Sequence, residues 1–254
     1  MYRGTVTHVT GAHANVGERN TSYLAGYSAA VDEKRTEDLE AIYRNRFDDR
    51  ELASKRALWR VLVHDFFQRY VPRDGTVVDL GAGSCEFVNE IRAARRIAVD
   101  LNPDTAGWAG AGVEVLTTRS DAMDDLDDGC VDTVFTSNFF EHLPTKSDLM
   151  STLAECQRVT RPGGQIVVLM PNIRYLPGRY WDYLDHHLPL THLSVAEALE
   201  LAGYEVVESI GRFLPYTVKD AKFEVRPVMV RAYLRLPLAW RFLGKQMLVV
   251  GRRR

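Results

Sequence analysis

The chain has few cysteines and no long apolar run. Its three cysteines, Cys85, Cys130 and Cys156, are far apart and form no Cys-x-x-Cys pair, which is typical of a protein in a reducing compartment. No apolar segment approaches the length that a bilayer requires, and the first residues lack the apolar stretch of a signal peptide. We therefore expect a cytoplasmic protein without stable membrane insertion.

A strong charge of either sign is also missing. The net charge is −2 for 254 residues, so nothing favours a nucleic-acid backbone as a partner. Internal repeats and low-complexity tracts are absent from the sequence. A hydrophobic content of 46% is enough for one α/β domain with additional segments.

Three regions follow one another along the chain. Residues 1–30 are rich in small and polar residues without periodicity, and we expect a mobile arm there. Residues 31–72 are predicted to form an N-terminal helical cap, because apolar side chains recur at helical spacing from Asp32 to about Tyr70. Residues 73–254 alternate strand and helix patterns, as a doubly wound sheet requires.

The patterns predict seven strands, at 76–80, 96–100, 113–117, 131–136, 165–170, 204–210 and 246–251. They predict helices near 85–94, 103–109, 145–159 and 194–202. The segment from Arg161 to Gly164 is predicted to be a turn before the fifth strand. Residues 228–250 mix apolar and basic side chains, which also suits a membrane surface. Because Pro237 divides that stretch, we interpret it as packed chain that ends in the last strand.

The most informative pattern is a short strand that ends in an acid and a glycine turn. Val77–Leu80, which contains Asp79, is followed by Gly81-Ala82-Gly83, and glycine allows a ligand to approach the main chain closely. About twenty residues later a second strand ends in Asp100, whose carboxylate can accept hydrogen bonds from a ribose. The pattern predicts a cofactor of the adenosine type.

Two acids near the turn indicate which cofactor. The third glycine of the dinucleotide fingerprint falls at position 86, which is Glu86. A carboxylate there, close to a helix N-terminus, would repel a pyrophosphate. Asp79, just before the turn, instead suits a cofactor that carries positive charge, such as a sulfonium with an amino-acid moiety.

The segment that starts at Asp79 resembles motif I of the class I S-adenosylmethionine-dependent methyltransferases, with Cys85 in place of the last glycine. Further segments extend the resemblance over about residues 40 to 254, in the order Val99–Pro103, Ser120–Ala122, Val131–Asn138, Phe139–Leu143 and Val159–Gly164. The nearest branch is that of the type 11 small-molecule methyltransferases. The resemblance implies a Rossmann-like, doubly wound, seven-stranded sheet whose seventh strand is antiparallel and lies between the fifth and the sixth.

The resemblance also implies S-adenosyl-L-methionine as the cofactor, with Asp100 on its ribose and Asp121 on its adenine. The positions that it assigns to the cofactor are Asp79, Gly81, Ala82, Gly83, Asp100, Leu101, Asp121, Ala122, Asn138 and Phe139. An aromatic face such as that of Phe139 adds about 0.5–2 kcal/mol beside a sulfonium. Lys55, on the helical cap, is a candidate partner for the methionine carboxylate, with a solvated helix face as the alternative.

Candidate catalytic residues follow the fourth strand. His142 is the first candidate for a general base, because an imidazole near its ordinary pKa accepts a proton at neutral pH. Its alternative role is to shape the loop. Glu141 is a weaker candidate, and His186 is the second candidate after His142.

His186 belongs to a second polar cluster, Asp182–His192, in an expected acceptor-site insertion at about 171–193. Histidines and aspartates together are typical of a metal site. Adjacent His186 and His187 point in different directions on most backbones, however, and no two side chains have the spacing of a helical ligand pair. We therefore expect no metal, and we expect Thr191 or Ser194 to cap the next helix.

The sequence as a whole predicts an enzyme that transfers a methyl group from S-adenosylmethionine to an oxygen or nitrogen of a small molecule or sugar, in a natural-product or glycan pathway. The alternative is a non-methylating or non-catalytic S-adenosylmethionine-binding member of the same fold. An NAD-dependent oxidoreductase is less favoured because of Glu86. The acceptor and the oligomeric state stay open.

Overall fold

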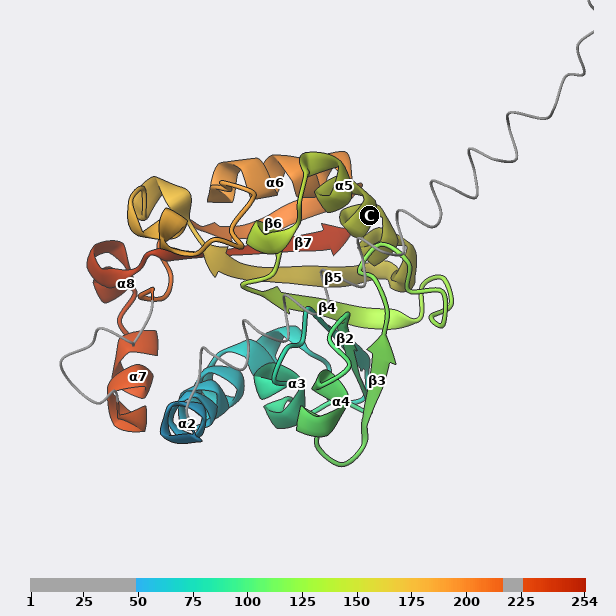
Figure 1. The fold of residues 1–254 in the computed structure, drawn as a ribbon, viewed down its shortest axis with the longest axis horizontal. Coiled ribbons are helices and arrows are strands. Elements are labelled where there is room, and N and C mark those ends of the chain that lie inside the picture. The colour runs from blue at the N-terminus through green and yellow to red at the C-terminus, as the bar shows by residue number, and fades with distance from the viewer. Residues whose placement is uncertain (1–48, 217–225) are drawn as a thin grey trace, which may run out of the picture. The chain divides into compact units, whose positions relative to one another are not determined.

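A computed structural model describes residues 49–216 and 226–254, with side chains from Ser54 onward. The predicted arm, residues 1–30, and the beginning of the predicted helical cap lie outside these residues. The described part contains one seven-stranded sheet with the strand order β3-β2-β1-β4-β5-β7-β6 (Figure 1).

The strands are β1 (Thr76–Leu80), β2 (Arg95–Asp100), β3 (Val113–Thr117), β4 (Val131–Ser137), β5 (Thr160–Pro171), β6 (Tyr204–Ile210) and β7 (Gln246–Arg253). The α-helices are α2 (Asp49–Asp65), α3 (Glu86–Glu90), α4 (Thr105–Trp108), α5 (Lys146–Val159), α6 (His192–Leu201), α7 (Pro227–Leu234) and α8 (Pro237–Leu243). Four 3-10 turns complete the set: η1 (Phe67–Tyr70), η2 (Phe140–His142), η3 (Ile173–Tyr175) and η4 (Arg179–Asp182).

The first five strands are parallel to one another, and β7 is antiparallel to both of its neighbours, β5 and β6. The predicted sheet is therefore confirmed, including the place and direction of its last strand. Chain order reverses at β1, because β2 and β3 lie on one side of it and β4 on the other.

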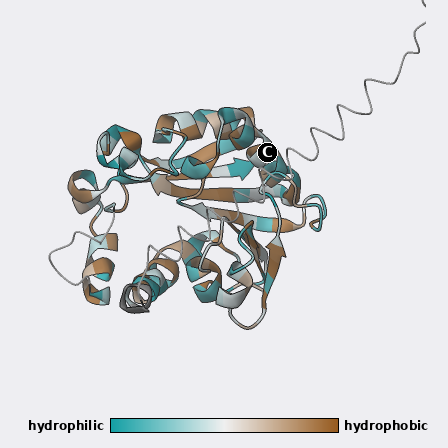
Figure 2. Cartoon of the chain, viewed as in Figure 1, coloured by the Kyte–Doolittle hydropathy of each residue, from teal (hydrophilic) through white to brown (hydrophobic). Residues whose placement is uncertain are grey.

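Alternate residues of each strand face opposite layers of helices, as the two-residue period of a strand requires. Val78, Ile166 and Val249 belong to a core that also contains residues of α5 and α6. Their neighbours Val77 and Val250 belong to a second core, with residues of α2, α3 and α7. Figure 2 shows hydrophobic residues along the central strands, which both layers cover.

Local signals fix the ends of several elements. A capping box starts α5, in which the side chain of Thr145 accepts from the Asp148 amide while Asp148 accepts in return. The same motif, from Thr191 and Ser194, starts α6 and confirms the predicted cap. Such a cap contributes about 1 kcal/mol to the stability of its helix.

Two predictions about local structure were wrong, the end of α3 and the turn before β5. Helix α3 ends at Glu90 and not at residue 94, because Ala94 and Arg95 already donate to the Gly75 carbonyl and turn the chain into β2. The expected turn from Arg161 to Gly164 is a bulge inside β5, since Val131 pairs with Thr160 while Thr133 pairs with Gln165.

Helices α7 and α8 were not predicted. Each begins with a proline at its first position, Pro227 in α7 and Pro237 in α8. Proline is well suited to that position, because the amide it lacks would have no partner in the helix. The proline that we interpreted as a break is thus the start of a helix. Among the described residues, none of the helices combines the length and the apolar character that crossing a bilayer demands.

The second core is dominated by aromatic rings around Phe67, which is completely buried. Its ring neighbours are Trp59, Phe66, Tyr70, Phe87, Phe135 and Phe213. We expect Phe67→Ala to lower the free energy of unfolding by about 3–5 kcal/mol, because it removes apolar contacts and leaves a cavity. Urea denaturation measures the change, and Leu201→Ala, at a side chain that is 74% exposed, is the control and should change it by less than about 0.5 kcal/mol.

Candidate functional site

The carboxyl ends of the parallel strands meet at one edge of the sheet, where doubly wound folds bind their ligands. Loops from β1, β2 and β4 lie together at this edge because β1 pairs with both β2 and β4. Chain order reverses there, and such a switch point is where open α/β sheets bind their ligands. Most of the site residues predicted from the sequence lie in these loops.

The turn after β1 approaches its neighbours too closely for a side chain at Gly81. The amides of Gly81 and Ala82 both donate to the Val99 carbonyl of β2, at 2.9 and 3.2 Å. Gly81 has a φ of +70°, and a Cβ on it would lie 2.6 Å from the ring of Phe139. Two predicted cofactor residues, Gly81 and Phe139, are thus in direct contact across the β1–β4 switch point.

Backbone strain is concentrated at the same edge. Among the described residues, the non-glycine residues with positive φ are Cys85, at +61°, and Asn138, at +49°. Cys85 stands where motif I of the resembling family has glycine, and it keeps the conformation that glycine takes without strain. Such conformations cost on the order of 1–3 kcal/mol and cluster at ligand sites.

Two buried carboxylates flank the glycine turn. Asp79 is 3% exposed, and its Oδ2 accepts from the Val88 amide of α3 at 3.2 Å. Burial raises the pKa of Asp79 well above its ordinary value, against the hydrogen bond from Val88. Asp100 accepts from the Gly83 amide at 2.7 Å and from the Asn102 amide at 2.9 Å. Burial also raises the pKa of Asp100, and these hydrogen bonds reduce that effect.

Lys55 reaches the glycine turn from α2. Its Nζ lies 2.8 Å from the Glu86 carboxylate, which also accepts from the Ser84 hydroxyl at 2.6 Å. The ammonium group is therefore beside the turn, as expected from the sequence. Its positive charge is paired with the negative charge of Glu86.

The other predicted cofactor positions follow the strands in the expected order. Leu101 comes directly after β2, and Asp121 and Ala122 lie in the loop after β3. The Asp121 carboxylate accepts two hydrogen bonds from Arg119, at 2.9 and 3.0 Å. Asn138 follows β4, where its amide donates to Leu169 of β5 at 2.9 Å.

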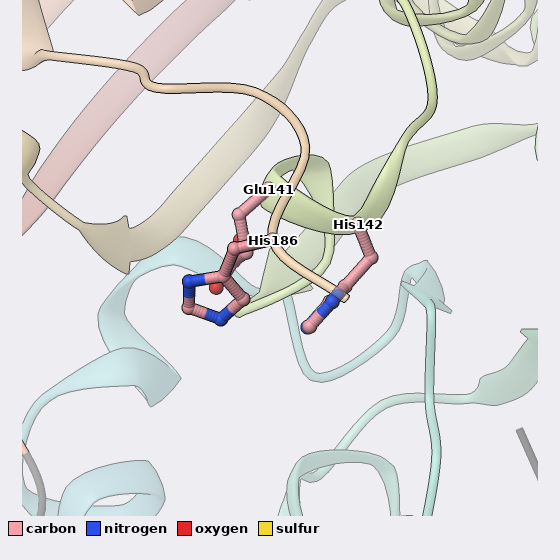
Figure 3. Close-up of side chains that lie close together, drawn as sticks. All are labelled: Glu141, His142 and His186. Atoms are coloured by element: carbon pink, nitrogen blue, oxygen red, sulfur yellow. The ribbon is translucent and has the colours of Figure 1, made fainter. Parts of the chain in front are cut away.

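A second group of side chains joins two segments that are far apart in the sequence. Glu141 and His142 extend from η2, and His186 extends from the loop that passes beside it (Figure 3). One ligand-type atom from each of the three residues lies within 4.8 Å of the other two. The Glu141 carbonyl accepts from the amides of His187, at 2.7 Å, and Leu188, at 3.1 Å, and these bonds attach the loop to η2.

Asp185 orients the ring of His142. Nδ1 of His142 lies 2.9 Å from the Asp185 carbonyl and 3.2 Å from its carboxylate Oδ2. Because both partners are acceptors, Nδ1 carries the hydrogen and Nε2 carries the lone pair. Burial lowers the pKa of His142, but the hydrogen bond to Asp185 and the charges of Glu141 and Asp185 outweigh burial, so the net shift is upward.

Glu141 has an unusual environment. It is 1% exposed, and neither carboxylate oxygen has a hydrogen-bond partner among the described residues. Burial raises the pKa of Glu141 to about 7, although the charge of His142 counteracts this shift. A buried acid with no donor is expensive to ionise, so the fold keeps Glu141 for a reason other than stability.

The structure brings together all three catalytic candidates, Glu141, His142 and His186. It also adds Asp185, whose pairing with His142 was not predicted. The only signal in the sequence was the position of Asp185 beside His186. A contact across this many residues depends on how the loop folds back onto η2, which no local pattern encodes.

Comparison with known proteins also points to a methyltransferase. Residues 78–168 match a protein family described as a methyltransferase domain. A protein of Mycolicibacterium smegmatis, named as a probable S-adenosylmethionine-dependent methyltransferase, is 34% identical over 144 residues, which make up 54% of this chain and 54% of that relative. The match thus spans about half the length of this curated relative.

Solved structures share the fold. A SAM-dependent methyltransferase from Archaeoglobus fulgidus is 20% identical, with a TM-score of 0.59 over 78% of this chain and 94% of that one. Geranyl diphosphate C-methyltransferase from Streptomyces coelicolor, solved with Mg²⁺, geranyl diphosphate and S-adenosyl-L-homocysteine, is 14% identical, with a TM-score of 0.56 over 77% and 76% of the two chains. At these identities the likeness concerns the fold.

Sheet order, strand directions and the glycine turn at the switch point define a Rossmann-like α/β protein of the nucleotide-binding type. Within that class, residues 78–168 match a methyltransferase-domain family, and the curated relative and the solved structures that the chain resembles are S-adenosylmethionine-dependent methyltransferases. S-adenosylmethionine is therefore the cofactor that these similarities support. The observed edge suits this cofactor, because the open main chain at Gly81 allows close approach and the buried acids Asp79 and Asp100 favour a cation.

We expect Asp100→Ala to weaken the binding of S-adenosylhomocysteine by about 1.5–3 kcal/mol, or about 10- to 150-fold, the scale of hydrogen bonds to a charged group. The variant also loses the bonds to Gly83 and Asn102 that hold the turn. Calorimetry measures the affinity, with Asp104→Ala, an exposed acid four residues on, as the control. Equal affinities for Asp100→Ala and the wild type would show that Asp100 does not contact the cofactor.

Proposed function

We propose that the chain transfers the methyl group of S-adenosylmethionine to an oxygen or nitrogen nucleophile of a small molecule or a sugar. The observation that carries this proposal is the convergence of Glu141, His142 and His186 within 4.8 Å, in the segment that follows Phe139. Phe139 contacts Gly81, and Glu141 and His142 follow Phe139 by only two and three residues, so both start close to the glycine turn. Groups that exchange protons are thus next to the expected cofactor site.

When bound, S-adenosylmethionine supplies a methyl group on a positively charged sulfur, with a neutral thioether as the leaving group. The chain therefore has to hold the nucleophile in line with that methyl group, about 3 Å away. The two bonds that the Glu141 carbonyl accepts, from His187 and Leu188, fix the loop to η2. This attachment keeps both segments at a defined distance from the glycine turn.

A hydroxyl or a protonated amine must also lose a proton before it is methylated. Nε2 of His142 is the first candidate for the atom that accepts this proton, because Asp185 holds the hydrogen on Nδ1. His186 is the second candidate. Its ring stacks on Tyr183 at a centroid distance of 5.2 Å and lies 4.7 Å from the ring of Tyr180, so its orientation is also fixed by packing.

The composition of the loop supports a small acceptor. Aromatic side chains, Tyr180, Trp181 and Tyr183, surround a few polar groups, and Trp181 is 52% exposed. Sites for small molecules combine apolar or aromatic walls with a small number of placed polar groups. Methyl-labelled cofactor, incubated with hydroxylated and amine metabolites and sugars, tests the proposal. No labelled product from any acceptor, with intact cofactor binding, would favour a non-methylating member of the fold.

We expect His142→Ala to lower kcat by about 10²–10⁴-fold, the usual contribution of a positioned proton acceptor, and to leave the affinity for S-adenosylhomocysteine within about twofold. Steady-state kinetics with the labelled product and calorimetry measure the two quantities. His64→Ala, at a histidine of α2 that lies near Glu90, is the control and should match the wild type. Full turnover in His142→Ala together with a loss in His186→Ala would transfer the role to His186.

A further inference from the structure

We propose that Glu141, His142 and His186 form the binding site of one divalent transition-metal ion, which binds the acceptor through a hydroxyl group. Two imidazoles and one carboxylate are the ligands that zinc and its first-row neighbours prefer, whereas Mg²⁺ and Ca²⁺ prefer oxygen ligands. Three protein ligands leave a coordination position for a further oxygen, as in catalytic zinc sites.

The carboxylate of Glu141 is the first observation that points to a cation. It is 1% exposed, and neither of its oxygens meets a hydrogen-bond donor among the described residues. Leaving a buried charge without a partner costs several kcal/mol, and buried charges are paired or coordinate metals. A cation bound between the carboxylate and the two imidazoles removes that cost.

The orientation of His142 is the second, independent observation. Histidines that bind metals usually donate their other ring N–H to a carboxylate or a backbone carbonyl. His142 makes both contacts with one residue, since its Nδ1 lies 2.9 Å from the carbonyl and 3.2 Å from the carboxylate of Asp185. This arrangement leaves Nε2, with its lone pair, as the ligand atom.

The distances suit a shared ion after a small adjustment. Ligand atoms that lie about 2.0–2.2 Å from a tetrahedral zinc ion are about 3.3–3.5 Å from one another. The three ligand-type atoms are within 4.8 Å of one another, so they have to approach by no more than about 1.5 Å to share an ion. His187 cannot join them, since its side chain is exposed whereas that of His186 is buried.

The ion gives the site a second way to remove the acceptor's proton. A hydroxyl oxygen bound to the ion has a lowered pKa, so its O–H bond breaks and the proton passes to water. The oxygen then forms the bond to the methyl carbon, and the electron pair of the breaking C–S bond stays on sulfur. In this arrangement His142 is a ligand and not the proton acceptor. This step rests on the proposed methyltransferase function and selects oxygen acceptors.

The test is a titration of the untagged full-length chain, treated with a chelator and dialysed, with Co²⁺ and with Zn²⁺. We expect one equivalent to bind, with visible Co²⁺ absorption that reports coordination by nitrogen and oxygen. Glu141→Gln and His186→Ala should each weaken binding by more than about tenfold, and Asp185→Asn, which weakens the support of His142, by about 10- to 100-fold. His187→Ala is the matched control and should bind the metal like the wild type.

S-adenosylhomocysteine binding by each variant shows that the fold is intact. The metal proposal is overturned if the wild type binds neither ion, or if Glu141→Gln binds as tightly as the wild type. Chelator treatment should lower the transfer of label to a hydroxyl acceptor, and one equivalent of Zn²⁺ should restore it. Transfer that is unaffected by the chelator would return His142 to the role of proton acceptor. Metal binding without transfer to any acceptor would instead contradict the proposed function.

Discussion

The close approach of Gly81 to Phe139 is the contact on which the site depends. It occurs because β4 pairs with β1 on the side opposite β2, so that the turn after β1 and the segment after β4 meet at one edge. A Cβ at position 81 would lie 2.6 Å from the aromatic ring, which leaves glycine as the residue that fits. The same contact places Glu141 and His142 near the glycine turn, since both residues follow Phe139 directly in η2. The glycine turn and the segment of Glu141 and His142 are therefore connected by one packing contact, that between Gly81 and Phe139.

Buried acids give this edge its electrostatic character. Burial raises the pKa values of Asp79, Asp100 and Glu141, so each of these carboxylates resists ionisation in the absence of a cation. A positively charged ligand lowers the pKa of such a carboxylate, because its charge stabilises the ionised form by more in a buried site than in water. The proposed sulfonium cofactor would supply such a charge at this edge. In the proposed function Glu141 lies on the acceptor side, with His142 and His186 close to it, and the proposed metal ion would be a second cation there.

How well the sequence predicts the structure depends on how local each signal is. Strands β1, β3 and β6 were predicted with the observed bounds, because each is a short segment rich in apolar and β-branched residues between turn residues. The glycine turn was equally predictable, since Gly81 and Gly83 have positive φ, a conformation that favours glycine. Helix α3 was predicted too long because the residues after it, Ala94 and Arg95, donate hydrogen bonds to the carbonyl of Gly75, which precedes the helix in the sequence. The pairing of His142 with Asp185 was not predictable at all, because it joins two loops through the folding of the chain between them.

The same distinction explains why the metal interpretation was set aside on the sequence alone. A pair of ligands on one helix has a fixed spacing, and neither Glu141-His142 nor His186-His187 has it. The three candidate ligands come instead from η2 and from the loop before α6. Two hydrogen bonds, from backbone amides of the loop to the Glu141 carbonyl, hold these segments together. A ligand set assembled in this way is formed only when the loop is in place. Binding of an ion would therefore stabilise the attachment of the loop to η2, so that metal binding and closure of the acceptor site favour each other by the same free energy.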